Sequence, residues 1–297
     1  MFSIIKKNTN FNFLEFRKLA IVFSSFLIIV CILSFSTKGL NWGIDFSSGY
    51  IAQLKYEDDI EIQELKKSLM KTGIKDSVIQ YYGNKQEVIL KLKDNQEFDQ
   101  TSVNTFLKKS LSEGKDFKIL RLEYVGSQVG SELREKGEWA MLVALLSILV
   151  YIGFRFEFLY GIGAIFALLH DVILTLGFFS ITQLQFDLSV LAAILAVIGY
   201  SLNDTIVVYD RIRENMNLTR KKSFLDVLNL SINQTLSRTI ITSLTTLFVL
   251  FSLLLIGGIA VKFFSIAMII GVLVGTYSSI FIASTSLYFL GVNSKDN

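Results

Sequence analysis

Proline is absent from the sequence, and cysteine occurs only once. Average usage would give roughly fifteen prolines in a chain of this length, so we expect any helix break to come from glycine. Because Cys31 is the only cysteine, no intrachain disulfide and no cysteine metal site can form. The sequence also has no P-loop pattern for a nucleotide. We therefore expect no cofactor, and an energy source outside the chain.

Charged residues are missing from several long stretches, and 52% of all residues are hydrophobic. The net charge of +3 is too small to indicate a nucleic-acid partner. Six segments have the roughly 20 mostly apolar residues that a spanning helix needs. They are residues 19–36, 138–154, 158–181, 188–209, 239–257 and 263–290. The sequence therefore predicts a multi-pass protein of a lipid membrane.

Lysine and arginine near the span ends predict the orientation, because they collect on the cytoplasmic side. The first 18 residues carry four of them, and residues 210–238 carry six. Both termini are therefore expected in the cytoplasm, and residues 37–137 outside it. The predicted division is a cytoplasmic segment 1–18, a first span 19–36, an outer domain 37–137, a five-helix region 138–290 with a cytoplasmic amphipathic loop 210–238, and a cytoplasmic tail 291–297.

The outer segment alternates between strand and helix patterns. The predicted elements are strand 49–56, helix 60–72, strand 77–82, strand 86–92, helix 98–112 and strand 117–125, with a turn at Gly83-Asn84. This βαββαβ order is typical of the ferredoxin-like arrangement. The predicted fold class is a membrane all-α bundle of six transmembrane helices with an extracytoplasmic α+β ferredoxin-like domain.

The cytoplasmic loop contains a helix signal. Ser223 and Asp226 form a capping pattern, and Phe224, Leu228 and Ile232 follow at a spacing of four. This pattern predicts an amphipathic helix on the membrane surface.

Two ionisable residues near the cytoplasmic ends of spans are candidates for function, because charge inside a membrane is costly. Asp204 lies in the fourth span, and Arg238 opens the fifth. Loss of water favours the neutral form of Asp204, whereas a nearby Arg238 favours the carboxylate. A change in their separation would bind or release a proton. A static pair that fixes helix packing is the equally open alternative.

His170 and Asp171 lie near the middle of the third span. Adjacent helical residues point about 100° apart, so we do not expect both to face one partner. Interhelical hydrogen bonding explains the histidine well, and a proton relay is the second interpretation.

Two intramembrane protease mechanisms are disfavoured, so we expect no enzyme. Ser201 could act with His170, but Gly199-Tyr200-Ser201-Leu202 lacks the second glycine of a nucleophile turn. Asp171 and Asp204 could share a proton, but their expected depths differ by one or two helical turns.

Several strings resemble those of SecD and SecF export proteins. Gly43-Ile44-Asp45-Phe46 follows the first span, and Val125-Gly126-Ser127-Gln128-Val129-Gly130 precedes the second. The string Gly199-Tyr200-Ser201-Leu202-Asn203-Asp204-Thr205-Ile206-Val207-Val208-Tyr209-Asp210 resembles the SecF fourth-span motif. Ser237-Arg238-Thr239 resembles the fifth-span motif. We interpret the first string as structural, and Gly126 and Gly130 as a hinge.

The resemblance implies a half that pairs with SecD in a twelve-helix unit similar to resistance-nodulation-division transporters. It implies action with the SecY, SecE and SecG channel on preproteins at a bacterial inner membrane, with H⁺ as the coupling ion. The implied proton pathway comprises Asp204 and Arg238, to which we add Asn203, Thr205, His170 and Asp171. Half of an efflux or lipid transporter and a non-conducting assembly subunit remain alternatives.

Overall fold

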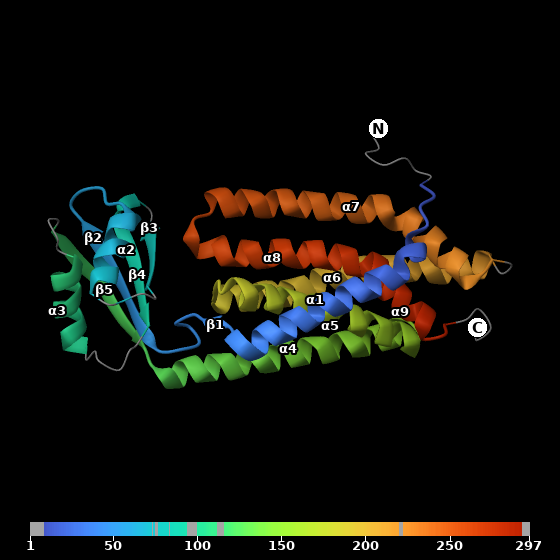
Figure 1. Cartoon of the computed structure of the whole chain (residues 1–297), viewed down its shortest axis with the longest axis horizontal. Coiled ribbons are helices and arrows are strands. Elements are labelled where there is room, and N and C mark those ends of the chain that lie inside the picture. Colours follow the sequence, from blue (N-terminus) through green and yellow to red (C-terminus); the bar gives the residue numbers. More distant parts are fainter. Residues whose placement is uncertain are drawn as a thin grey trace.

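The computed structural model describes residues 9–72, 74, 77–82, 84–93, 100–111, 116–219 and 222–292. Within them lie a helical bundle and a small α+β domain at one end of it (Figure 1). Gly83 of the predicted turn, as well as Lys6, Lys7, Arg220 and Lys221 of the basic segments, lie outside the described residues.

The described part of the chain has six helices long and apolar enough to cross a membrane, as predicted. The helical elements are α1 (Arg17–Lys38), α4 (Ser127–Arg155), α5 (Phe158–Thr182), α6 (Leu188–Leu218), α7 (Phe224–Ile256), α8 (Ile259–Ser278) and α9 (Ser284–Phe289). A π-helical turn, Ser279–Ala283, joins α8 to α9 into one span. The start of α1, the end of α9 and the α6–α7 connection all lie at the end of the bundle away from the domain (Figure 1).

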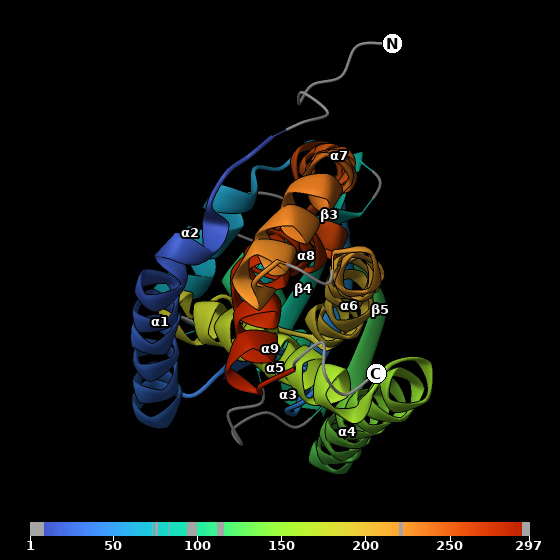
Figure 2. The same ribbon diagram turned by 90° about the vertical axis from the view of Figure 1, so that its right-hand side faces the viewer.

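Three spans form the inside of the bundle. The most apolar windows of α5, α6 and the α8–α9 span are 56%, 56% and 50% buried, against 17%, 11% and 17% for α1, α4 and α7. α1 packs on α5 and α7 packs on α8, so these outer helices flank the inner group (Figure 2). Polar side chains on the inner spans are therefore shielded on most sides by protein.

Because the chain has no proline, we expected glycine at the helix breaks, and the structure agrees at some helix ends but not at all of them. α1 ends at Gly39 with φ 66°, and α8 begins after Gly258 with φ 71°, both backbone conformations that favour glycine. α5 ends at Gln183 with φ 54°, a non-glycine residue whose side chain bonds the Ser180 carbonyl at 2.7 Å. The expectation that glycine makes every break was therefore wrong at this position.

Three predicted boundaries in the membrane region differ from the structure, and one of them is the end of α6, which reaches Leu218 instead of residue 209. α4 starts at Ser127 instead of residue 138. The prediction counted only apolar residues and so omitted the first turns of the helix, which are charged. The predicted surface helix after Ser223 is not separate, since it forms the first turns of α7. Its Ser223 cap is present, with the hydroxyl accepting from the Asp226 amide at 3.3 Å. However, Leu228 and Ile232 are buried in the bundle core instead of facing lipid.

The small domain has the predicted βαββαβ order. Its elements are β2 (Gly49–Tyr56), α2 (Ile62–Lys71), β3 (Ser77–Tyr82), β4 (Asn84–Lys93), α3 (Gln100–Leu111) and β5 (Phe117–Val125). The antiparallel sheet has the order β3-β4-β2-β5. Alternate residues of β2 and β4 are buried against α2 and α3, so the domain has its own core.

A pair of two-residue strands was not predicted. β1 (Asn41–Trp42) runs parallel to β6 (Gln185–Phe186), which lies in the α5–α6 turn. The ladder ties the segment after α1 to the end of the inner helices that lies nearest the small domain (Figure 1).

Candidate functional site: a buried carboxylate cluster and Asp204

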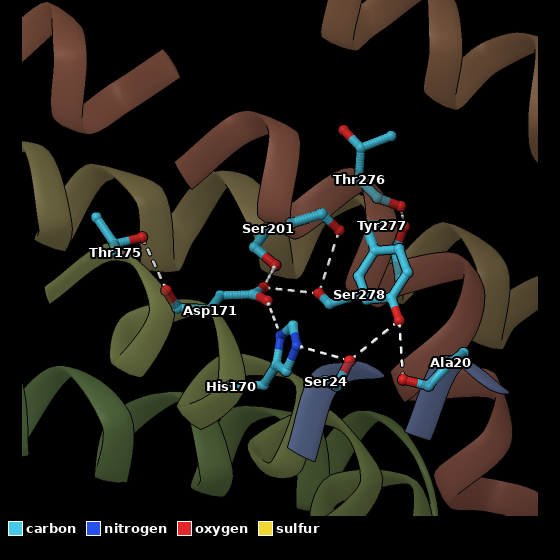
Figure 3. A network of polar contacts seen from close by, with 11 residues as sticks. Ala20, Ser24, His170, Asp171, Thr175, Ser201, Thr276, Tyr277 and Ser278 are labelled. Atoms are coloured by element: carbon cyan, nitrogen blue, oxygen red, sulfur yellow. Dashed lines mark hydrogen bonds and ion pairs between the residues drawn. The ribbon is translucent and has the colours of Figure 1, made fainter. Parts of the chain in front are cut away.

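A buried polar cluster joins four helices near the middle of the bundle (Figure 3). We call it the Asp171 cluster. Its members are Ser24 of α1, His170 and Asp171 of α5, Ser201 of α6, and Tyr277 and Ser278 of α8. The Asp171 side chain is 1% exposed, so protein donors replace the water that would otherwise solvate it.

Three donors converge on the Asp171 carboxylate. His170 Nδ1 lies 2.9 Å from Oδ1, and Ser278 Oγ donates to Oδ2 at 2.7 Å. The Ser201 hydroxyl donates to the same Oδ2. The cluster therefore brings an imidazole and a carboxylate into direct contact inside the bundle.

His170 extends the cluster to α1. Its Nε2 lies 3.2 Å from Ser24 Oγ, and that hydroxyl lies 3.0 Å from the Tyr277 hydroxyl. Among the described residues the two side chains bond different neighbours, as expected, and they also contact each other directly, which was not predicted. The interhelical hydrogen bond expected for the histidine is present.

Close approach of α6 and α8 lets both serines reach one carboxylate. A Cβ at Gly275 would lie 3.0 Å from the Cβ of Ser201, and a Cβ at Gly271 would collide with the Val197 side chain. Sequence reasoning missed Ser24, Tyr277, Ser278 and this glycine pair. The spacing Gly271-x-x-x-Gly275 in an apolar span was the available signal, because small residues bring membrane helices together.

Asp204 lies one helical turn beyond Ser201 on α6, so it is close to the cluster along the same helix. It is 3% exposed, and its Oδ2 has no hydrogen-bond partner among the described residues. The buried Thr205 hydroxyl has none there either. Buried polar atoms are normally paired, so this carboxylate oxygen is a candidate for a role beyond packing.

The static Asp204–Arg238 pair was one of two open interpretations of the sequence. Within the ranges that the structure describes, no nitrogen of Arg238 lies within 4.0 Å of Asp204, and the Arg238 side chain is exposed. Asn203 is exposed as well, on another face of α6 from Asp204. The static ion pair that we left open as a packing device is therefore absent from this conformation.

The string Gly43 to Phe46 docks on the α5–α6 turn. The Gly43 amide donates to the Phe186 carbonyl at 2.8 Å, and the Leu188 amide donates to Asp45 Oδ2 at 3.2 Å. Ile44 and Phe46 are buried, and the Phe46 ring lies 5.8 Å from that of Phe186. These are packing contacts between the string and the α5–α6 turn, and the structural role of the string stays a prediction.

Gly130 belongs to the same docking region. It lies in the first turn of α4, and a Cβ there would lie 2.5 Å from the Ser47 carbonyl oxygen. Gly126 precedes the helix and has more room, with the Tyr124 ring 3.7 Å from such a Cβ. The hinge role of both glycines stays a prediction, to which the structure adds a packing reason for Gly130.

Six spanning helices, one α+β domain between the first two, and buried carboxylates on the inner spans define the class as a multi-pass membrane protein with an ionisable interior. Residues 105–293 match the family described as "Protein export membrane protein SecD/SecF, C-terminal". Residues 33–60 match the "SecD/SecF GG Motif". The chain belongs to the SecD/SecF family of protein-export membrane proteins.

Similar proteins agree over almost the whole chain. The "Protein translocase subunit SecF" of Calditerrivibrio nitroreducens is 46% identical, with 97% of this chain and 96% of that protein covered. The subunit of the same name from Vibrio alginolyticus is 42% identical, covering 99% and 94%. The likeness supports a SecF subunit of the Sec protein translocation system and a place in the bacterial inner membrane.

A solved structure has the same fold. The crystal structure of SecDF, "a translocon-associated membrane protein", from Thermus thermophilus has a TM-score of 0.80 and 36% identity. The match covers 96% of this chain but 39% of that one. This chain therefore spans about two fifths of the SecDF chain, which supports association with SecD.

Proposed function

We propose that the chain couples proton movement through its inner helices to motion of the outer domain, and so assists preproteins as they cross the membrane. The observation that carries this proposal is the Oδ2 atom of Asp204, which is buried without a partner among the described residues, one turn from Ser201 of the Asp171 cluster. A carboxylate without a partner can take up a proton without first breaking an ion pair. The proton pathway comprises Asp204, Arg238, Thr205, His170 and Asp171, with Asn203 at its exposed side.

The energy available fits such a coupling. Moving one charge through 100 mV supplies about 2.3 kcal/mol, so a few protons can bias a domain motion of a few kcal/mol. Because α1, α5, α6 and α8 all contribute to the Asp171 cluster, a change of its protonation alters contacts between four spans at once. The β1–β6 ladder then links these spans to the domain.

The topology of the proposal places both termini in the cytoplasm and the small domain outside, as the distribution of Lys and Arg indicates. The domain is ferredoxin-like by its βαββαβ order and the strand order β3-β4-β2-β5. SecD, the SecY, SecE and SecG channel and the preprotein are the proposed partners, and H⁺ is the proposed coupling ion.

The same proposal gives the chain no catalytic reaction and no cofactor. The Ser201 hydroxyl donates to the Asp171 carboxylate, and His170 contacts Asp171 instead of Ser201. A nucleophilic serine needs the histidine beside its own hydroxyl, so this arrangement does not activate Ser201.

The test is preprotein export into inverted inner-membrane vesicles with an imposed proton gradient. Asp204→Asn should lose the part of export that depends on the gradient, because an amide does not take up a proton at this position. Asp210→Asn is the matched control, since it makes the same change at an exposed site of the same helix. The proposal fails if Asp204→Asn, at equal abundance, exports as much preprotein in response to the gradient as wild type does. The chain would then be a non-conducting assembly subunit.

A further inference from the structure

A groove of about 390 Å³ lies where α1 and α9 both pack on α5. Its lining is apolar for the most part and includes Ile28, Phe166, Leu169 and Phe289. The rings of Phe166 and Phe289 are 55% and 65% exposed, within segments that qualify as membrane spans. The surroundings of such a groove in a bilayer are hydrocarbon chains, because water is excluded there.

The groove lies in the cytoplasmic half of the proposed topology. Its α1 residues begin at Ile21, one turn after the start of α1, and its α9 residues reach Phe289, where that helix ends. Its mouth is therefore near the headgroups of the inner leaflet.

Lys18 lies one helical turn before the first groove residue of α1 and on the same face of that helix. Lys18 precedes Ile21, Ser25 and Ile28 by three, seven and ten residues, so the four share one face of α1. Lys18 is exposed and has no ion-pair partner in the described part of the chain. The neighbouring Arg17 is already engaged, since its Nη1 donates to the Leu14 carbonyl at 2.8 Å.

Polar atoms line the inner wall. Thr285 is 2% exposed, lines the groove, and its hydroxyl has no hydrogen-bond partner within the described residues. Ser24 and His170 line the same groove from the side of the Asp171 cluster. An apolar tail in the groove would therefore cover one side of that cluster.

We propose that the groove binds one acyl chain of an anionic phospholipid of the inner leaflet, with the phosphate at Lys18. The ammonium supplies charge complementarity, and the apolar walls receive the chain. The bound chain keeps water away from Ser24 and His170. This binding goes beyond the export role and does not require that role to be correct.

The test uses the full chain in phosphatidylcholine vesicles and a phosphatidylglycerol that carries a photoactivatable group in its acyl chain. Cross-linked positions are mapped by mass spectrometry, and unlabelled phosphatidylglycerol and phosphatidylcholine are compared as competitors. We expect labelling at the groove residues of α1, α5 and α9. Competition should favour phosphatidylglycerol about fivefold, the factor given by roughly 1 kcal/mol for one lysine near the surface.

Two variants and two controls make the result specific. Lys18→Gln should abolish the preference for phosphatidylglycerol, and Ser25→Trp should fill the groove and remove the labelling. Lys38→Gln changes a lysine at the other end of α1, and Val22→Trp adds the same ring on a face outside the groove, so both should label as wild type. Equal competition by the two lipids, or labelling that Ser25→Trp leaves unchanged, would overturn the proposal. Neither result depends on export activity.

Discussion

At the scale of single residues, the structure separates two buried aspartates that look alike in the sequence. Asp171 has three donors on its carboxylate, whereas Asp204 Oδ2 has no partner in the described chain. Asp171→Asn should therefore lower the thermal unfolding midpoint in detergent, because an amide NH₂ would then face donors. Asp204→Asn should leave the midpoint unchanged or raise it, since the buried charge disappears without loss of a bond. Equal destabilisation by both substitutions would contradict this distinction.

The serine donors of the cluster are expected to matter for stability by a measurable amount. Ser278→Ala removes a bond between helices and should cost on the order of 1 kcal/mol, seen as a lower unfolding midpoint. Ser265→Ala is the control on the same helix, because that hydroxyl donates only to the Val261 carbonyl of its own helix at 2.8 Å. A control that costs as much as Ser278→Ala would argue against a special role for the cluster.

Tyr56 gives a pH prediction outside the membrane. Its hydroxyl is buried without a partner among the described residues, and burial raises the pKa of its phenol above the usual 10. The folded domain therefore holds this proton more tightly than the unfolded chain. The folded state keeps its full free energy of unfolding below pH 10, where this phenol is neutral in both states. That free energy falls as the pH rises through the folded-state pKa, because the buried phenol then has to ionise. Tyr56→Phe should raise the unfolding midpoint at pH 7 and weaken its decline above pH 10, as followed by circular dichroism. A decline as steep as that of wild type would exclude Tyr56 as its cause.

At the scale of helices and strands, the sequence predicted most of the pattern. Strands 49–56, 77–82 and 117–125 have the predicted bounds, because alternating burial and turn residues mark them clearly. The β1–β6 pair was not predictable in this way, since strands of two residues have no period and their partners lie far apart in the chain. The Asp171 cluster was half predicted. Its charged members are conspicuous in an apolar span, but Ser24 and Ser278 look like any serine that bonds its own helix.

Contact between α6 and α8 gives a prediction at this scale. Gly271→Ala should destabilise the bundle by about 1–3 kcal/mol, because its methyl group collides with the Val197 side chain. Val197→Ala in the same chain should restore much of the loss by making room. Thermal unfolding of the two single variants and the double variant provides the test, and simple additivity of their effects would contradict a direct contact.

At the scale of the whole molecule, the small α+β domain is held to the membrane region by the docked string Gly43 to Phe46. Gly130→Ala should disturb this docking, because its Cβ would lie 2.5 Å from the Ser47 carbonyl oxygen. Gly126→Ala is the matched control with room for a methyl group. Hydrogen exchange of the amides in 41–47 should quicken in Gly130→Ala only. Equal loss of export in both variants, with exchange unchanged, would favour a flexible hinge instead of packing.

The proposed coupling between the membrane helices and the small domain depends on proton passage through this chain. The most direct measurement is proton uptake by vesicles that contain the chain with SecD and a pH-sensitive dye inside, under an imposed gradient. Wild type and Asp210→Asn should dissipate the gradient, whereas Asp204→Asn and Asp171→Asn should retain it. Dissipation by Asp204→Asn as fast as by wild type would contradict the account.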